Sequence, residues 1–456
     1  MAQYTLSTRP YNWIPLLAFC LFAAPVLCCQ QADRATAASD RQAMLQQLAI
    51  SSLRPPVSQK AANYDEFRAN LYPALPDPLR LNNGRPVRTA RDWWQRRRPE
   101  LLALFSQEVL GQVPAGAPKV HWKILSQSRE TAAGIPITIK HLAGEIDNVS
   151  FPALQVSIDL LVVTPAEARR PVPLVMELAF SADNMALLGR YFPEMLPGGK
   201  GNEGPSWQEQ VLNRGWGYAI LLPTSLQEDS PLGLRRGVIG LTSHGLPRQP
   251  GDWGAIRAWA WGASRAMDYF ASDPAIDASH VAIEGHSRFG KTALVAMATD
   301  QRFAAAYISS SGTGGTKPYR HIFGEQLENL AGENSWHWMA GNFLRYAGPK
   351  TVADLPVDAH ELIALCAPRP VFIGVGSATA GDAWADPAGE FLGAVAAGPV
   401  YRLLGARDLS TGQMPPMETA LTGGELAFRQ HRYGHTPGPN WPAFLDFAAR
   451  YLEPGK

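Results

Sequence analysis

The sequence V-A-I-E-G-H-S-R-F-G-K-T-A-L-V-A-M-A, residues 281–298, decides the fold of this chain. Its start favours a strand, its end favours a helix, and a glycine-flanked turn with Ser287 at the tip joins them. Glycine suits such a turn because the backbone is strained and packs against the sheet, while the serine hydroxyl stands clear. The order predicts a nucleophile elbow with Ser287 as nucleophile. Phe289 occupies the place of the second glycine in G-x-S-x-G, and Gly290 follows one residue later.

The residues after the elbow include the partners that a nucleophilic serine needs. In this arrangement an acid follows a late strand, and a histidine lies in a loop near the C-terminus. The apolar run Val371–Val375 is followed by Asp382 and Asp386, and His435 comes later, with His431 as a reserve. The chain order serine, aspartate, histidine therefore predicts an α/β-hydrolase.

Strand-like and helical runs agree with that fold class. Strand-like runs cover residues 120–124, 155–163, 174–178, 218–222, 281–284, 305–309 and 371–375. Helical runs separate the later ones, notably Trp253–Phe270. Consecutive strands followed by alternating strands and helices predict a three-layer sandwich with a mostly parallel sheet and antiparallel first strands. We expect one catalytic domain over residues 61–456.

The N-terminus has the pattern of an export signal. Arg9 precedes an apolar stretch at residues 13–27, which is shorter than the ~20 residues that span a membrane. We expect a signal peptide over residues 1–29 and a periplasmic or secreted protein. Cys29 ends a loose lipoprotein box, so an outer-membrane lipoprotein anchored at Cys29 is the alternative. Residues 30–60 are rich in Ala, Gln, Ser and Asp, and we expect them to form a flexible tether with a short helix around Met44–Leu53.

Charge and cysteine content exclude other classes of protein. The chain has 41 basic and 40 acidic residues, which leaves no electrostatic footprint for nucleic acid. Beyond the export signal only Cys366 remains, so we expect a fold without a disulfide. We expect a monomer.

Several ordered motifs carry a family resemblance. They are G-D-W-G-A-I-R-A-W-A-W-G-A-S-R-A-M-D-Y (251–269), the elbow, S-G-T-G-G (311–315), F-G-E (323–325), D-A-W-A-D-P-A-G-E (382–390) and the late G-H. Over roughly residues 60–450 the chain resembles the glucuronoyl esterases, carbohydrate esterase family 15, particularly bacterial members. The resemblance implies hydrolysis of esters between 4-O-methyl-glucuronic acid of xylan and alcohols of lignin, with no metal or organic cofactor.

The resemblance also assigns roles to individual residues. Arg288 matches the arginine after the nucleophile, where the backbone N–H and the guanidinium can stabilise an oxyanion. Lys291, Glu325 and Trp384 match the residues that bind the sugar. We therefore expect Ser287, His435, Asp382 and Arg288 to be catalytic and these three to bind substrate.

Two positions depart from the family's fungal members. Those enzymes have a disulfide-bonded cysteine at the position of His286, and a glutamate at the position of Ser310. His286 is poorly placed to accept the proton of an adjacent serine in a strained turn. Ser310 cannot serve as the acid. Asp382 matches the aspartate that many bacterial relatives supply from the later loop, so the resemblance implies Asp382 as the acid, with Asp386 as the reserve.

Two other functions remain open at this point. The chain could be another serine esterase on the same fold, such as an acetyl-xylan esterase, which needs no clamp for a uronic acid. It could also be a non-catalytic uronate-binding relative, because of the missing carboxylate at residue 310.

Overall fold

The computed structural model describes residues 36–453 apart from 73, 191, 192 and 197. The export signal and Cys29 lie outside the described residues, so both stay predictions. Within the described part, every helix is too short or too polar to cross a membrane.

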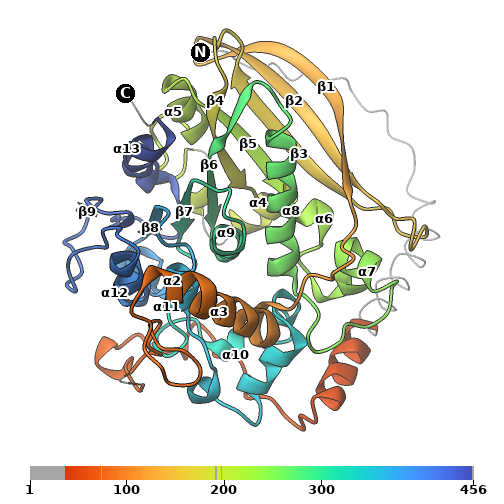
Figure 1. The fold of residues 1–456 in the computed structure, drawn as a ribbon, viewed down its shortest axis with the longest axis vertical. Coiled ribbons are helices and arrows are strands. Elements are labelled where there is room, and N and C mark those ends of the chain that lie inside the picture. Colours follow the sequence, from red (N-terminus) through yellow and green to blue (C-terminus); the bar gives the residue numbers. More distant parts are fainter. Residues whose placement is uncertain (1–35, 73, 191–192, 197, 454–456) are drawn as a thin grey trace, which may run out of the picture.

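One mixed β-sheet runs through the centre of the described chain (Figure 1). Its strands lie in the order β1-β2-β3-β5-β4-β6-β7-β8-β10-β9. Their bounds are β1 Val120–Ala132, β2 Ile135–Ile146, β3 Ser157–Pro165, β4 Val172–Leu178, β5 Gly217–Leu222, β6 Ile276–His286, β7 Ala305–Ser309, β8 Val371–Val375, β9 Ala420–Leu421 and β10 Leu426–Gln430. The first three strands and β5 pair antiparallel, and the run from β5 to β10 is parallel. The predicted α/β-hydrolase architecture is confirmed.

Helices cover both faces of the parallel strands. Their bounds are α2 Ala90–Asp92, α3 Arg98–Leu104, α4 Ala182–Leu188, α5 Trp207–Asn213, α6 Pro223–Leu226, α7 Gly237–Thr242, α8 Ala255–Phe270, α9 Arg288–Thr299, α10 Leu327–Leu330, α11 Ala359–Ala364, α12 Pro387–Leu403 and α13 Trp441–Leu452. Side chains alternate between the two faces of a strand. Leu174 and Met176 of β4 accordingly share a core with α8, α9 and α12, while Val175 packs with α5 and α13.

Three strands were not predicted from the sequence: β2, β10 and β9, the last of which has only two residues. β2 forms a hairpin with β1 through Ala133 and Gly134, which both have positive φ. This turn is of the kind that usually carries Asn-Gly, and Pro136 further weakens the strand signal of β2. β10 is short, and its pairing with β8 is a contact distant in sequence.

Residues 36–50 of the predicted tether are packed against the rest of the fold, with Met44, Leu45, Leu48 and Ile50 buried. Residues 36–47 form a helix. The short helix expected at Met44–Leu53 therefore overlaps it only over residues 44–47. Met44 is 2% exposed within the main core, and a Cβ on Gly341 would collide with its sulfur atom. Arg235 Nε donates to Asp40 Oδ2 at 2.8 Å. The alanine-rich composition suggested a tether, but the apolar side chains of this helix are buried.

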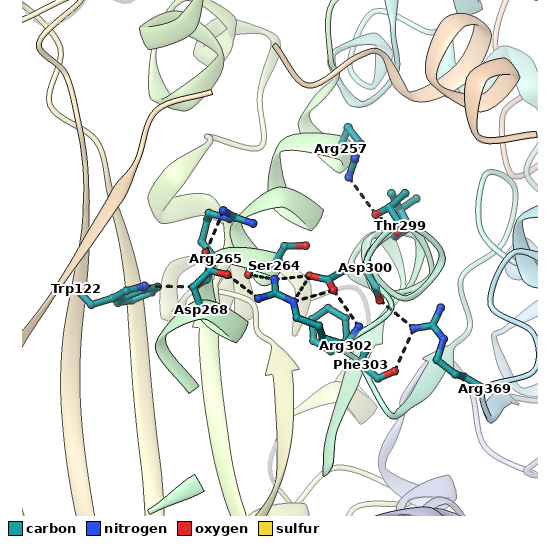
Figure 2. Close-up of polar contacts among 11 residues, drawn as sticks. Trp122, Arg257, Ser264, Arg265, Asp268, Thr299, Asp300, Arg302, Phe303 and Arg369 are labelled. Atoms are coloured by element: carbon teal, nitrogen blue, oxygen red, sulfur yellow. Dashed lines mark hydrogen bonds and ion pairs between the residues drawn. The ribbon is translucent and has the colours of Figure 1, made fainter. Parts of the chain in front are cut away.

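A network of arginines fixes the end of α9 that is remote from Ser287 (Figure 2). Arg302 donates to Asp268 of α8 and to Asp300, each at 2.6 Å. Arg369 donates to the carbonyl oxygens of Asp300 and Phe303 at 2.9 and 3.1 Å. Cations are favourable near a helix C-terminus, where backbone carbonyls lack helical partners. The network joins α8, the end of α9 and the segment that precedes β8.

We expect Met44→Ala to lower the free energy of unfolding by about 2–5 kcal/mol, because it removes a buried side chain and leaves a cavity. Gln46→Ala, on the exposed side of the same helix, is the control and should change it by less than about 0.5 kcal/mol. Urea denaturation of both variants measures the difference. Equal stability of the two variants would show that the segment is a tether after all.

Candidate active site

Ser287 lies at the turn between β6 and α9 with a backbone φ of +58°. This conformation is strained for a residue with a side chain and persists only where the surroundings enforce it. The enforcing groups are backbone atoms. A Cβ on Gly285 would collide with the carbonyl of Phe289, and a Cβ on Gly290 would lie 2.9 Å from the carbonyl oxygen of Ser309. The second glycine of this elbow therefore stands at 290, because residue 290 faces β7.

A cavity of about 230 Å³ opens above this turn, at the carboxyl ends of the parallel strands. Ligands bind at this edge of the sheet in open α/β folds. The cavity is lined by the predicted site residues Ser287, Arg288, Lys291, Glu325, Trp384 and His435, together with Gln59, Phe180, Leu188, Met195, Ser310, Ser311, Gly312, Trp338 and Ala385. Among the predicted site residues Asp382 alone does not line the cavity, and it lies behind His435.

Asp382 is 1% exposed and holds His435 in one orientation. Its Oδ1 lies 2.6 Å from Nδ1 of His435. Its Oδ2 accepts from the backbone N–H of Gly376 at 2.6 Å and from Oγ of Ser310 at 2.7 Å. With the proton on Nδ1, Nε2 of a neutral imidazole is an acceptor. Ser310 thus orients the aspartate, a role that the sequence comparison with fungal members did not suggest.

The two reserve residues have other partners. Asp386 caps α12 and bonds to Nδ1 of His321 at 2.6 Å. His431 is fully buried, with Nε2 2.9 Å from the carbonyl oxygen of Thr436, and its Nδ1 accepts from the N–H of Tyr433. Both side chains therefore support neighbouring loops rather than the cavity.

His286 packs beside His435 without lining the cavity. The ring centroids of the two histidines are 4.3 Å apart, and Nδ1 of His286 lies 3.0 Å from Oγ of Ser309. Burial, followed by the nearby charge of His435, holds the pKa of His286 well below its usual value. A neutral His286 supports the ring of His435 without competing for a proton.

Arg288 is held at the cavity by an ion pair and two aromatic rings. Its Nη1 lies 2.5 Å from Oδ2 of Asp229. Its guanidinium carbon lies 5.3 Å from the ring centre of Trp338 and 5.9 Å from that of Phe180. These contacts orient a cation that follows Ser287 in sequence and begins α9, where backbone N–H groups are also available.

Asp229 is a site residue that sequence reasoning missed. Its Oδ1 accepts from Nε1 of Trp338 at 2.6 Å and lies 3.1 Å from Nε2 of His337. Burial would raise the pKa of Asp229, but the hydrogen bond from His337 and the charge of Arg288 outweigh it and hold the pKa well below its usual value. Asp229 is 59 residues from Arg288, and no local motif pointed to it.

The three predicted sugar-binding residues come together on one side of the cavity. Lys291 is 4% exposed, and its Nζ lies 3.0 Å from Oε2 of Glu325 and 2.7 Å from the carbonyl oxygen of Ser311. The N–H of Glu325 donates to the carbonyl oxygen of Trp384 at 2.9 Å. A cation, a carboxylate and an indole face the same space, a set that can bind sugar hydroxyls and a sugar ring.

Glu390 holds the loop that carries the S-G-T-G-G motif. Its Oε1 accepts from the N–H of Gly312 at 2.7 Å, and its Oε2 lies 2.6 Å from Oγ1 of Thr316. Burial raises the pKa of Glu390 to about 8. Glu390 therefore fixes the loop without adding a full negative charge beside Asp382 at neutral pH.

One cluster among the described residues has the composition of a metal site: Glu66, His321 and Asp386. Both ring nitrogens of His321 already face carboxylate oxygens, Asp386 at 2.6 Å and Glu66 at 3.0 Å. That is the geometry of two hydrogen bonds, and none of the three residues lines the cavity.

A larger cavity, of about 510 Å³, lies at the opposite edge of the sheet. Residues that precede or begin β4, β5 and β6 line it, including Arg169, Arg214 and Trp216. It holds none of the predicted site residues, so the smaller cavity is the candidate active site.

Comparison with known proteins gives one consistent result. A family model described as glucuronyl esterase of fungi matches residues 246–405. Carbohydrate esterase MZ0003, from an unknown prokaryotic organism, is 34% identical over 86% of this chain and 93% of its own length. A 4-O-methyl-glucuronoyl methylesterase of Schizophyllum commune is 27% identical over 73% of this chain and 74% of its own.

Solved structures agree with these relatives. A carbohydrate esterase family 15 glucuronoyl esterase from Teredinibacter turnerae is similar with a TM-score of 0.84 and 45% identity, over 91% of this chain and 99% of its own. A glucuronoyl esterase from Solibacter usitatus gives a TM-score of 0.72 and 33% identity, over 84% and 99%.

We expect Asp382→Asn to lower kcat on an ester substrate by about 10²–10⁴-fold, because the amide favours the wrong tautomer of His435. Asp386→Asn is the matched control. An asparagine can still cap α12. Because residue 386 contacts His321 and not His435, kcat should fall by less than about tenfold. Steady-state kinetics of the two variants, with thermal unfolding as a folding check, decide the assignment. If Asp386→Asn were the inactive one, the acid would be Asp386.

We expect Asp229→Asn to lower kcat by about 10–100-fold and to leave KM within about threefold, because the variant releases Arg288 from its fixed orientation. Asp268→Asn removes an aspartate that pairs with an arginine outside the cavity and should leave both parameters unchanged. Because Asp229 acts through Arg288, a lower kcat with a nearly unchanged KM is the result that identifies this role. A loss explained entirely by less folded protein, or a change in KM alone, would contradict this role.

Proposed function

Because the chain belongs to the glucuronoyl esterases of carbohydrate esterase family 15 and is a carboxylic ester hydrolase, we propose that it cleaves esters of glucuronic acid and 4-O-methyl-glucuronic acid. The observation that carries the proposal is one cavity lined by Ser287, His435 and Arg288 together with the candidate sugar-binding residues. The Schizophyllum commune relative, a 4-O-methyl-glucuronoyl methylesterase, supports this class of substrate.

In the proposed first step Ser287 attacks the carboxyl carbon of the uronate ester. Nε2 of His435 takes the hydroxyl proton while Asp382 stabilises the imidazolium that forms. The guanidinium of Arg288 and the N–H groups at the start of α9 stabilise the tetrahedral oxyanion. Because Asp229 already orients the guanidinium of Arg288, no reorientation of Arg288 is needed when the oxyanion forms.

Collapse of the oxyanion breaks the ester bond. The proton on His435 goes to the leaving alcohol, and the uronic acid stays bound to Oγ of Ser287 as an ester. Water then attacks this glucuronoyl-enzyme with His435 as the base, and the same groups stabilise the second oxyanion. The products are the free uronic acid and the alcohol.

Specificity in this proposal lies on the acid side of the ester. Lys291, Glu325 and Trp384 bind the uronic acid, whereas the alcohol departs towards His435. A site that hydrogen-bonds substrate hydroxyls discriminates strongly against sugars that present them differently. We take the ester between glucuronoxylan and a lignin alcohol as the natural substrate, because its variable alcohol suits a site that recognises only the acid.

We expect the purified protein to hydrolyse benzyl glucuronate, and Ser287→Ala to lower the rate by at least about 10⁴-fold. An acetylated xylose ester, measured in parallel, should react much more slowly, because it offers no uronic acid to the three sugar-binding residues. Cleavage of the acetate alone would instead indicate an acetyl-xylan esterase.

Benzyl galacturonate gives a second test of the same site, because it differs from the glucuronate in the orientation of a single hydroxyl. Equal kcat/KM for the two esters would contradict a shaped sugar site. Binding of glucuronate with no turnover of any ester would indicate a non-catalytic relative.

A further inference from the structure

A segment near the N-terminus crosses the sugar side of the cavity. We call residues 54–69 the N-terminal strap. It is fixed at its start by Arg54, which pairs with Glu328 at 2.9 Å and donates to the carbonyl oxygen of Gly348 at 2.7 Å. Further along, the carbonyl oxygen of Val57 accepts from Nδ2 of Asn329 at 2.7 Å.

The end of the strap is bonded to the loop that carries the F-G-E motif. The N–H groups of Gly324 and Ile322 donate to the carbonyl oxygens of Asn63 and Ala69 at 2.9 and 2.8 Å. Nδ2 of Asn63 also donates to the carbonyl oxygen of Ile322 at 2.7 Å. Residues 57–63 are thus attached at both ends to the segment 322–329, which includes Glu325.

The same loop packs closely on the loop of Trp384. Gly324 has a φ of +57°, and a Cβ there would lie 2.6 Å from the carbonyl oxygen of Trp384. A side chain at 324 is therefore excluded by strain and by space. His321 lies between Asp386 and Glu66 of the strap, at 2.6 and 3.0 Å. Strap, F-G-E loop and tryptophan loop form one connected wall.

Gln59 is the strap residue that lines the cavity. It lies in a turn closed by bonds from the N–H groups of Ala61 and Ala62 to the carbonyl oxygen of Ser58, each 3.0 Å. Its side chain is exposed and lines the same cavity as Glu325 and Trp384. A carboxamide offers two donors and one acceptor, which is the chemistry that recognises a sugar hydroxyl.

We propose that Gln59 hydrogen-bonds a hydroxyl group on the carbohydrate side of the uronate ester, so that the N-terminal strap is a wall of the sugar subsite. The inference rests on the proposed function and extends it to a segment that the sequence predicted as a tether. Gln59 belongs to the acid side because its flanking residues are bonded to the segment of Glu325, whereas the alcohol departs towards His435.

The first test compares Gln59→Ala with wild type on methyl and benzyl glucuronate. Loss of one hydrogen bond made equally in ground and transition states raises KM about 3–10-fold and leaves kcat within twofold. The factor should be the same for both esters, because they share the acid and differ in the alcohol. Lys60→Ala, the exposed neighbour outside the cavity lining, is the matched control and should leave KM unchanged.

Calorimetric binding of methyl glucuronate to Ser287→Ala, with and without Gln59→Ala, separates this inference from the proposed function. Weaker binding in the double variant supports the inference even if the wild type turned over no ester. Unchanged binding and unchanged KM overturn it while the proposed function stands. A KM effect confined to the benzyl ester also overturns it, because Gln59 would then contact the alcohol. If methyl glucuronate did not bind at all, both proposals would fail.

Discussion

The close approach of three backbone segments at the elbow determines the geometry of the whole site. β6, the start of α9 and β7 come so near one another at Gly285 and Gly290 that a Cβ at either position would meet a carbonyl group. This contact forces Ser287 into a positive φ and lifts its side chain above the sheet. It also sets Arg288 at the start of α9 and Lys291 one turn further on, so one constraint positions three side chains.

Three carboxylates around the cavity each pair with a basic side chain. Asp382 meets His435, Asp229 meets Arg288, and Glu325 meets Lys291. A buried charge without a partner is strongly destabilising, so each pair restricts both of its members to a narrow range of orientations. The aspartates and Glu325 come from three loops distant in sequence, which explains why the cavity depends on the packing of the complete sheet.

The region around Lys291, Glu325 and Trp384 shows how a segment near the N-terminus can be bonded to the loops that line the cavity. The strap contacts the F-G-E loop partly through the backbone hydrogen bonds of Gly324 and Ile322, which do not require particular side chains. Such a connection leaves little trace in the sequence. The same is true of Ser310, whose role depends on Asp382, 72 residues away.

The sequence alone determined the fold class, and it predicted Ser287 as the nucleophile and the order of its partners, because strand, glycine-flanked turn and helix are local patterns. The ordered motifs likewise indicated the family, and they predicted three sugar-binding residues. Tertiary structure decided what depends on distant contacts: the hydrogen bond from Ser310 to Asp382, the support of Arg288 by Asp229, the pairing of β2 with β1 and β3, and the pairing of β10 with β8. It also turned the predicted tether into a packed helix and a strap, because burial depends on the surface that a segment meets and not on its composition.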